Sequence, residues 1–177
     1  CSSDLDTVPF GCWKKDVFNK YGFYDERLIR NQDIELNKRI VRGGGHIFIV
    51  PDTYCTYLAR ETFDGLAKNN FGNGKWNILT VYYTKQFKSL SVRHFIPLLF
   101  LLSLIVPSIL ACFYFPIGII SLISLLLYIF LISIISLSLA LKKKLCFLYL
   151  MKAFVILHMS YGWGSLVGII NMIGYRK

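Results

Sequence analysis

A stretch of 47 residues without one charged side chain, from position 95 to position 141, limits the possible folds of this chain more than any other feature. The hydrocarbon core of a bilayer is about 30 Å thick and needs roughly 20 apolar residues per helix, so the stretch is long enough to cross twice. We expect spans at about residues 95–115 and 117–141, joined by a tight turn at Pro116 and Gly118. The sequence therefore predicts a multi-pass protein of the cell membrane.

A third apolar segment, at about residues 146–173, is less uniform. It contains Lys152 and His158, which either mark a polar cavity or are accommodated by snorkelling of the lysine and hydrogen bonding of the histidine. Gly164 and Gly168 have the GxxxG spacing that favours close helix packing. Both a full span and a re-entrant or tilted interfacial helix stay open for this segment.

The first 94 residues have a different composition, because they carry all ten acidic residues and fourteen of the twenty basic ones. Apolar spacing predicts helices at residues 13–21 and 32–42, ended by Gly22 and by the glycines at 43–45. A β-branched and aromatic run predicts a buried strand at residues 46–50, and residues 7–12 suit a strand end or loop. This order of elements predicts the α/β fold class.

Residues 62–94 combine aromatic and basic side chains, with Thr62 as a candidate N-cap. Such a pattern is typical of an amphipathic helix at a membrane surface, where rings lie among the headgroups and lysines reach the phosphates. We therefore expect membrane lipid, and no nucleic acid, as the partner of the basic residues. The positive-inside rule places the lysines at 142–144 and the polar first half of the chain on the cytoplasmic side.

Several short motifs have the order and spacing of a known family. They are DTVPFG at residues 6–11, YGFYDE at 21–26, NQDIELNKRI at 31–40, GG at 44–45 and HMSYGWG at 158–164. These motifs resemble the acceptor half of family 2 glycosyltransferases, most closely the membrane-anchored enzymes of succinoglycan and other exopolysaccharide synthesis. The resemblance implies the C-terminal part of a GT-A-like domain at residues 1–61, an interfacial region at 62–94 and two to three transmembrane helices within residues 95–177.

Asp33 is the candidate catalytic residue. A carboxylate at a helix N-terminus is favoured in its ionised form by the helix dipole, so it can accept a hydroxyl proton. Taken alone, an Asp at this position is more often only an N-terminal helix cap, here together with Asn31. The resemblance instead implies that Asp33 is the general base that activates the acceptor hydroxyl for inverting attack on a nucleotide sugar.

The resemblance implies further contacts in the same site. Gln32 stands where the family often has Glu, and Lys75 stands where many relatives have Arg. Lys75 could offset the charge of the departing diphosphate as a point cation. The implied acceptor-binding residues are Gln32, Phe10, Gly11 and Trp76.

Asp4 and Asp6 have the form of a metal-binding D-x-D, but only 26 residues separate Asp6 from Asp33. The D-x-D of the family precedes the base by a much longer interval. We therefore expect no metal ligand in this chain and expect the D-x-D and the nucleotide pocket upstream. The chain is then a C-terminal fragment that is inactive alone.

The parent enzyme would transfer a sugar from a nucleotide donor to a lipid-linked saccharide acceptor, with Mg²⁺ or Mn²⁺ assisting departure of the diphosphate. Two alternatives stay open. One is a polyprenyl-phosphate sugar transferase, and the other is a non-catalytic membrane subunit of a polysaccharide export system.

Overall fold

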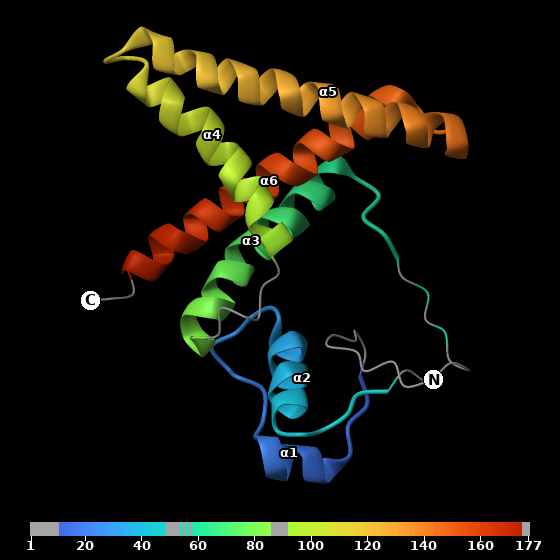
Figure 1. Cartoon of the computed structure of the whole chain (residues 1–177). Coiled ribbons are helices and arrows are strands. Elements are labelled where there is room, and N and C mark those ends of the chain that lie inside the picture. Colours follow the sequence, from blue (N-terminus) through green and yellow to red (C-terminus); the bar gives the residue numbers. More distant parts are fainter. Residues whose placement is uncertain (1–10, 49–53, 55, 57, 86–91, 175–177) are drawn as a thin grey trace. The chain divides into compact units, whose positions relative to one another are not determined.

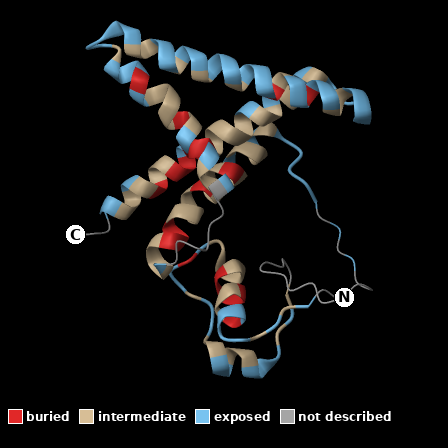
Figure 2. Ribbon diagram, viewed as in Figure 1, coloured by how far each residue is buried: buried red, intermediate tan, exposed pale blue. Residues whose placement is uncertain are grey.

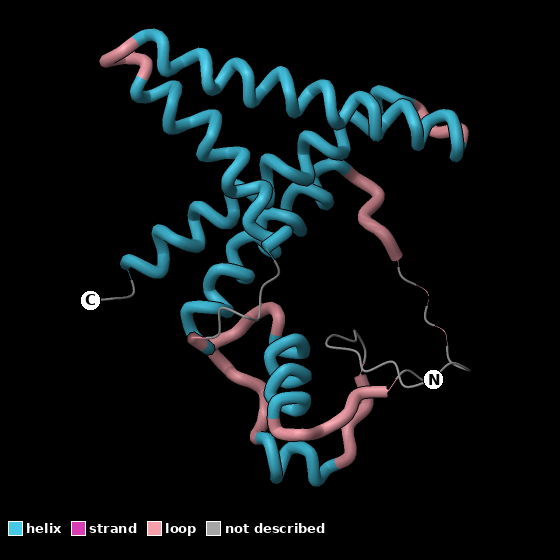
Figure 3. Tube along the Cα trace, in the orientation of Figure 1, coloured by secondary structure: helices cyan, strands magenta, loops and turns pink. Residues whose placement is uncertain are grey.

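The computed structural model describes residues 11–48, 54, 56, 58–85 and 92–174, and every regular element in this part of the chain is helical (Figure 3). Figure 1 labels the six α-helices; two short 3₁₀ turns, η2 (Val92–Phe95) and η3 (Phe115–Ile117), precede α4 and α5. The α-helices are α1 (Lys15–Tyr21), α2 (Gln32–Arg42), α3 (Phe63–Thr84), α4 (Ile96–Leu110), α5 (Gly118–Lys143) and α6 (Phe147–Gly174).

The chain divides into two compact units, and α3 contributes residues to both. The first unit consists of Cys1–Ala59 and Trp76–Leu90, and the second of Arg60–Lys75 and Ser91–Lys177.

The predicted α/β fold class, as the C-terminal part of a GT-A-like domain, is wrong: the described residues form an all-α structure. Within the predicted strand at 46–50, His46, Ile47 and Phe48 are irregular, and Phe48 is exposed. A strand needs a neighbouring strand to pair its backbone N–H and C=O groups, and the described residues provide none. Of residues 7–12, predicted as a strand end or loop, Gly11 and Cys12 are irregular, as a loop would be, and the rest lies outside the described residues.

The two helices predicted in the first unit are confirmed, and glycines end both of them. Gly22 adopts a φ of 82° after α1 and donates its N–H to the Phe18 carbonyl, while Gly44 adopts a φ of 80° just after α2. These left-handed conformations are readily available only to glycine. The first unit buries the side chains of Leu28, Leu36, Ile40, Leu79 and Val81.

An ion pair fixes the turn between α1 and α2. Arg39 contacts the buried Glu35 at 2.5 Å and also donates to the Tyr21 and Phe23 carbonyls, at 2.5 and 2.9 Å. The guanidinium therefore satisfies a buried carboxylate and two loop carbonyls at once, as its fork of donors permits.

Within its described residues, the second unit contains three helices that are long and apolar enough to cross a membrane. They lie at Arg93–Leu110, Phe115–Lys143 and Phe147–Gly174. The third apolar segment is thus one continuous helix of 28 residues. Most of the large apolar side chains of α5 are exposed (Figure 2), as expected of a helix that faces lipid.

Glycines allow α6 to approach its neighbours closely, and Gly164 of the predicted GxxxG pair is one of them. A Cβ on Gly164 would overlap the carbonyl of Phe71 in α3, and one on Gly74 would overlap the carbonyl of Tyr161. Gly162 meets α4 in the same way, because a Cβ there would lie 2.5 Å from the carbonyl oxygen of Pro97. Small residues at these positions let the helix backbones come into contact.

Serine hydroxyls join α4 to α5 beside Pro107. Pro107 has no N–H, so the Ser103 carbonyl lacks its helical donor. Ser121 of α5 places its hydroxyl 2.9 Å from the Leu104 carbonyl oxygen and 3.5 Å from that of Ser103. The hydroxyl thereby reaches the turn that Pro107 opens.

The polar residues of α6 also have partners within the second unit. His158 Nδ1 lies 3.1 Å from the Tyr128 hydroxyl, and the Tyr128 ring stacks on Phe100 with 4.1 Å between centroids. Lys152 Nζ lies 4.5 Å from the centre of the Phe63 ring. These contacts favour the interpretation in which His158 is packed and hydrogen-bonded.

Candidate functional site

Asp33 lies at the second position of α2, where the helix dipole favours a negative charge. The side chain is half-buried, and its Oδ1 accepts a hydrogen bond from the Ile34 N–H at 2.9 Å. A carboxylate has about four acceptor sites, so this bond leaves capacity for a substrate hydroxyl. The chemistry expected of a general base is therefore available to Asp33.

Asn31 positions the N-terminus of α2 rather than capping it. Its backbone is left-handed, with a φ of 64°, and its side chain makes no cap hydrogen bond. Instead, its Nδ2 donates to Asn77 Oδ1 at 2.8 Å and to Thr80 Oγ1 at 3.2 Å, both on the part of α3 that belongs to the first unit. The helix that carries Asp33 is thus tied at its first turn to a second helix.

Trp76 lies one helical turn before Thr80, one of the two residues that hold Asn31. Thr80, which is buried, donates its hydroxyl to the Trp76 carbonyl at 2.6 Å. The structure therefore places Trp76 within one helical turn of the residues that hold Asn31. The Trp76 side chain is half-buried.

The remaining predicted site residues are more dispersed. The Gln32 side chain points back toward the preceding turn, where its Nε2 donates to the Leu28 carbonyl. The amide that was expected to bind the sugar acceptor is therefore engaged in a hydrogen bond within the chain. Lys75 is half-buried and belongs to the second unit. Phe10, Asp4 and Asp6 lie outside the described residues.

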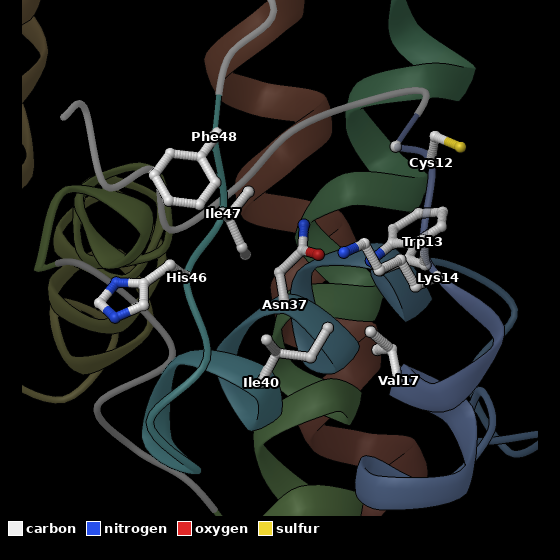
Figure 4. Close-up of a pocket in the computed structure, with 10 residues that line it drawn as sticks. Cys12, Trp13, Lys14, Val17, Asn37, Ile40, His46, Ile47 and Phe48 are labelled. Atoms are coloured by element: carbon white, nitrogen blue, oxygen red, sulfur yellow. The ribbon is translucent and has the colours of Figure 1, made fainter. Parts of the chain in front are cut away.

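Gly11 borders a cavity of about 530 Å³ in the first unit (Figure 4). Aromatic and aliphatic side chains from three places in the chain line this cavity. The Trp13 ring is held by an edge contact with Tyr24, at 6.0 Å between centroids, and by Phe18 at 6.4 Å. The lining residues are Gly11, Cys12, Trp13, Lys14, Val17, Asn37, Ile40, His46, Ile47 and Phe48.

Asn37 is the most unusual residue of the cavity wall. Only 1% of it is exposed, and its Nδ2 has no hydrogen-bond partner among the residues that the structure describes. Leaving a buried donor unpaired costs about 1–3 kcal/mol, so buried amides are normally bonded. The side chain projects from α2 into the space between Ile47 and Trp13 (Figure 4).

Sequence reasoning missed Asn37 and Trp13 as functional candidates. The available signal was a polar residue between Leu36 and Ile40, four positions after Asp33. Residues four apart share one face of a helix, roughly 6 Å apart along its axis. The spacing could have placed Asn37 next to the predicted base, but not shown that it is buried without a partner.

No group of three His, Cys, Asp or Glu side chains that could hold a metal ion occurs among the residues that the structure describes. The resemblance assigns the ligands of Mg²⁺ or Mn²⁺ to a region upstream, and we derive no step through a metal.

Comparison of the chain with family models, with curated proteins and with solved structures finds no match. The resemblance to family 2 glycosyltransferases stays a prediction that rests on the sequence motifs.

Proposed function

We propose that this chain forms the acceptor side of an inverting, membrane-bound glycosyltransferase of family 2. The enzyme transfers a sugar from a nucleotide donor to a lipid-linked saccharide in the synthesis of exopolysaccharide or cell-surface polysaccharide. The proposal assigns the nucleotide and its metal to a part of the enzyme outside the described residues.

The observation that carries the proposal is the placement of Asp33. The carboxylate stands at the start of a helix whose first turn is held to α3 by Asn31, and a cavity opens one turn further along that helix. Catalytic groups are effective when they project from rigid elements that other contacts hold in place. Three helices able to cross a membrane suit an acceptor that is itself anchored in lipid.

In the proposed reaction, Asp33 accepts the proton of the acceptor hydroxyl as that oxygen attacks the anomeric carbon. The bond from this carbon to the diphosphate oxygen breaks, and the nucleoside diphosphate leaves with the bonding electrons. Attack from the face opposite the leaving group inverts the configuration.

We further propose that the lysines at 142–144 and the first unit face the cytoplasm, where nucleotide sugars are made. Clusters of Lys and Arg at the ends of spans are retained on that side. The three lysines directly follow the apolar part of α5, and Lys142 and Lys143 lie in the last turn of this helix.

The experiment is the substitution Asp33→Asn in the natural gene product, assayed in membranes for sugar transfer from UDP- and GDP-sugars to lipid. The amide keeps the shape of the side chain but cannot accept a proton. We expect transfer to fall about 10²- to 10⁴-fold with unchanged membrane content of the protein. The matched control is Asp16→Asn, an exposed carboxylate at the start of α1, which should keep activity within about twofold.

Transfer within about twofold of wild type in Asp33→Asn would remove Asp33 from the mechanism. If polysaccharide export then also depended on the protein, the non-catalytic membrane subunit would be the better hypothesis.

A further inference from the structure

We infer that the cavity between α2 and the segment at residues 11–17 is a saccharide subsite, in which Asn37 donates a hydrogen bond to a sugar oxygen. The inference rests on the proposed function, because it assigns the occupant as part of the acceptor glycan.

The wall of the cavity contains an unpaired hydrogen-bond donor. Asn37 Nδ2 is buried, has no hydrogen-bond partner in the described part of the chain, and belongs to a side chain that lines the cavity. A purely apolar occupant, such as an acyl chain, would leave this donor unpaired, whereas a hydroxyl or ring oxygen would satisfy it. The occupant therefore carries an oxygen acceptor.

Aromatic and aliphatic side chains form the wall around that donor. Trp13 is fixed by Phe18 and Tyr24, so an aromatic wall is already in place before a ligand arrives. Gly11 lies so close to this ring that a Cβ on it would come within 2.5 Å of Trp13 Cζ2, and any larger residue would displace the ring. Sugars present their C–H faces to aromatic rings and their hydroxyls to polar groups. Binding pockets usually combine these two features, with a mostly apolar wall and a few polar groups.

The lining of the cavity carries little charge. The described lining residues include no carboxylate and one lysine, Lys14, whose side chain is drawn toward Asn37 in the view of Figure 4. A volume of about 530 Å³ lies within the range of small-ligand sites. A neutral, polyhydroxylated ligand fits this lining better than a nucleotide, whose phosphates require several cations.

The position of the cavity connects it to Asp33. Because Asp33 and Asn37 lie one turn apart on the same face of α2, a glycan that binds Asn37 extends along the helix toward the proposed base. Asn37 then acts as a positioning residue that helps select the acceptor.

The test is a titration of the detergent-solubilised natural gene product with methyl β-D-glucopyranoside, methyl α-D-mannopyranoside and cellobiose. Saturation-transfer NMR and tryptophan fluorescence report the binding, and uridine serves as a comparison ligand. We expect saccharide binding that weakens about tenfold in Asn37→Leu and in Trp13→Leu. The matched control is Asn19→Leu, an exposed asparagine on α1 that does not line the cavity and should leave the affinity unchanged.

Thermal unfolding separates binding from folding. Asn37→Leu should leave the unfolding midpoint unchanged or raise it, since the variant removes a buried donor that has no partner. Loss of affinity together with retained stability supports the inference. Equal saccharide affinity in wild type and Asn37→Leu, binding of uridine without saccharides, or no saccharide binding by wild type would overturn it.

Asp33→Asn distinguishes this inference from the proposed function. If saccharide affinity depends on Asn37 while transfer does not depend on Asp33, the subsite stands and the proposed catalysis fails. If transfer depends on Asp33 while the saccharide affinity is the same in wild type and Asn37→Leu, the subsite inference is wrong and the proposed catalysis stands.

Discussion

At the scale of single residues, two ion pairs hold the turn that precedes α2. Arg39 pairs with Glu35, which is 8% exposed, and Arg27 pairs with Asp25 two positions before it in the turn. The second pair is bidentate, with Arg27 Nε 2.9 Å from Asp25 Oδ1 and Nη2 2.7 Å from Oδ2. Loss of Arg39 would leave the buried Glu35 carboxylate without a counter-charge. Loss of Arg27 would have a smaller effect on Asp25, because that pair lies nearer to solvent.

We expect the Asp25 pair to make stability depend on pH in the acidic range. Hydrogen bonds from the Arg27 side chain hold the pKa of Asp25 below its ordinary value of 3.8. Because the folded-state pKa is the lower one, the pair stabilises the fold above about pH 4 and loses this effect as the pH falls through the lowered pKa. Arg27 is 60% exposed, so the contribution is below about 1 kcal/mol.

Asp25→Asn should therefore lower the free energy of unfolding at pH 7 but not at about pH 2, as measured by denaturant titration of tryptophan fluorescence. In an Arg27→Gln background the same substitution should have almost no effect at either pH. An equal loss at both pH values would contradict the ion-pair explanation.

At the scale of elements, α3 and α6 can come into contact because the residues at the contact, Gly74 and Gly164, have no side chain. We predict that Gly164→Leu destabilises the second unit by about 1–3 kcal/mol, since the new side chain must displace the backbone of α3 at Phe71. Gly174→Leu is the control, because nothing lies within 4 Å of a Cβ at that position. Unfolding in mixed detergent micelles, followed by circular dichroism, measures both variants. Equal midpoints for the two would show that α3 and α6 do not pack in this way.

The helices of this chain could be predicted from local sequence, but the absence of strands could not. α2 has the predicted bounds, 32–42, because apolar spacing and a following glycine act within the helix itself. Residues 46–48 have the composition of a strand, yet strand formation depends on a partner elsewhere in the chain, which a local pattern does not report. The same limit applies to the site: motif order indicated Asp33, whereas the burial of Asn37 arises only from packing.

At the scale of the whole molecule, two natural cysteines can establish which side of the membrane each turn occupies. Cys112 lies in the turn between α4 and α5, Cys146 lies between α5 and α6, and both are exposed. If the lysines at 142–144 are cytoplasmic, a membrane-impermeant maleimide should label Cys112 in intact cells and Cys146 only after permeabilisation. Variants that retain one of these cysteines and replace the other four provide matched samples. The reverse pattern would invert the proposed orientation.

The hydroxyl of Ser121 has a consequence for how the protein is made. If α4 entered the bilayer alone, the carbonyl that Pro107 deprives of its donor would face hydrocarbon, where an unpaired backbone group is costly. Ser121 reaches that turn only when α5 is already beside α4. During synthesis, α4 would therefore stay near the translocon until α5 has emerged from the ribosome, and the two helices would pass into lipid as one hairpin.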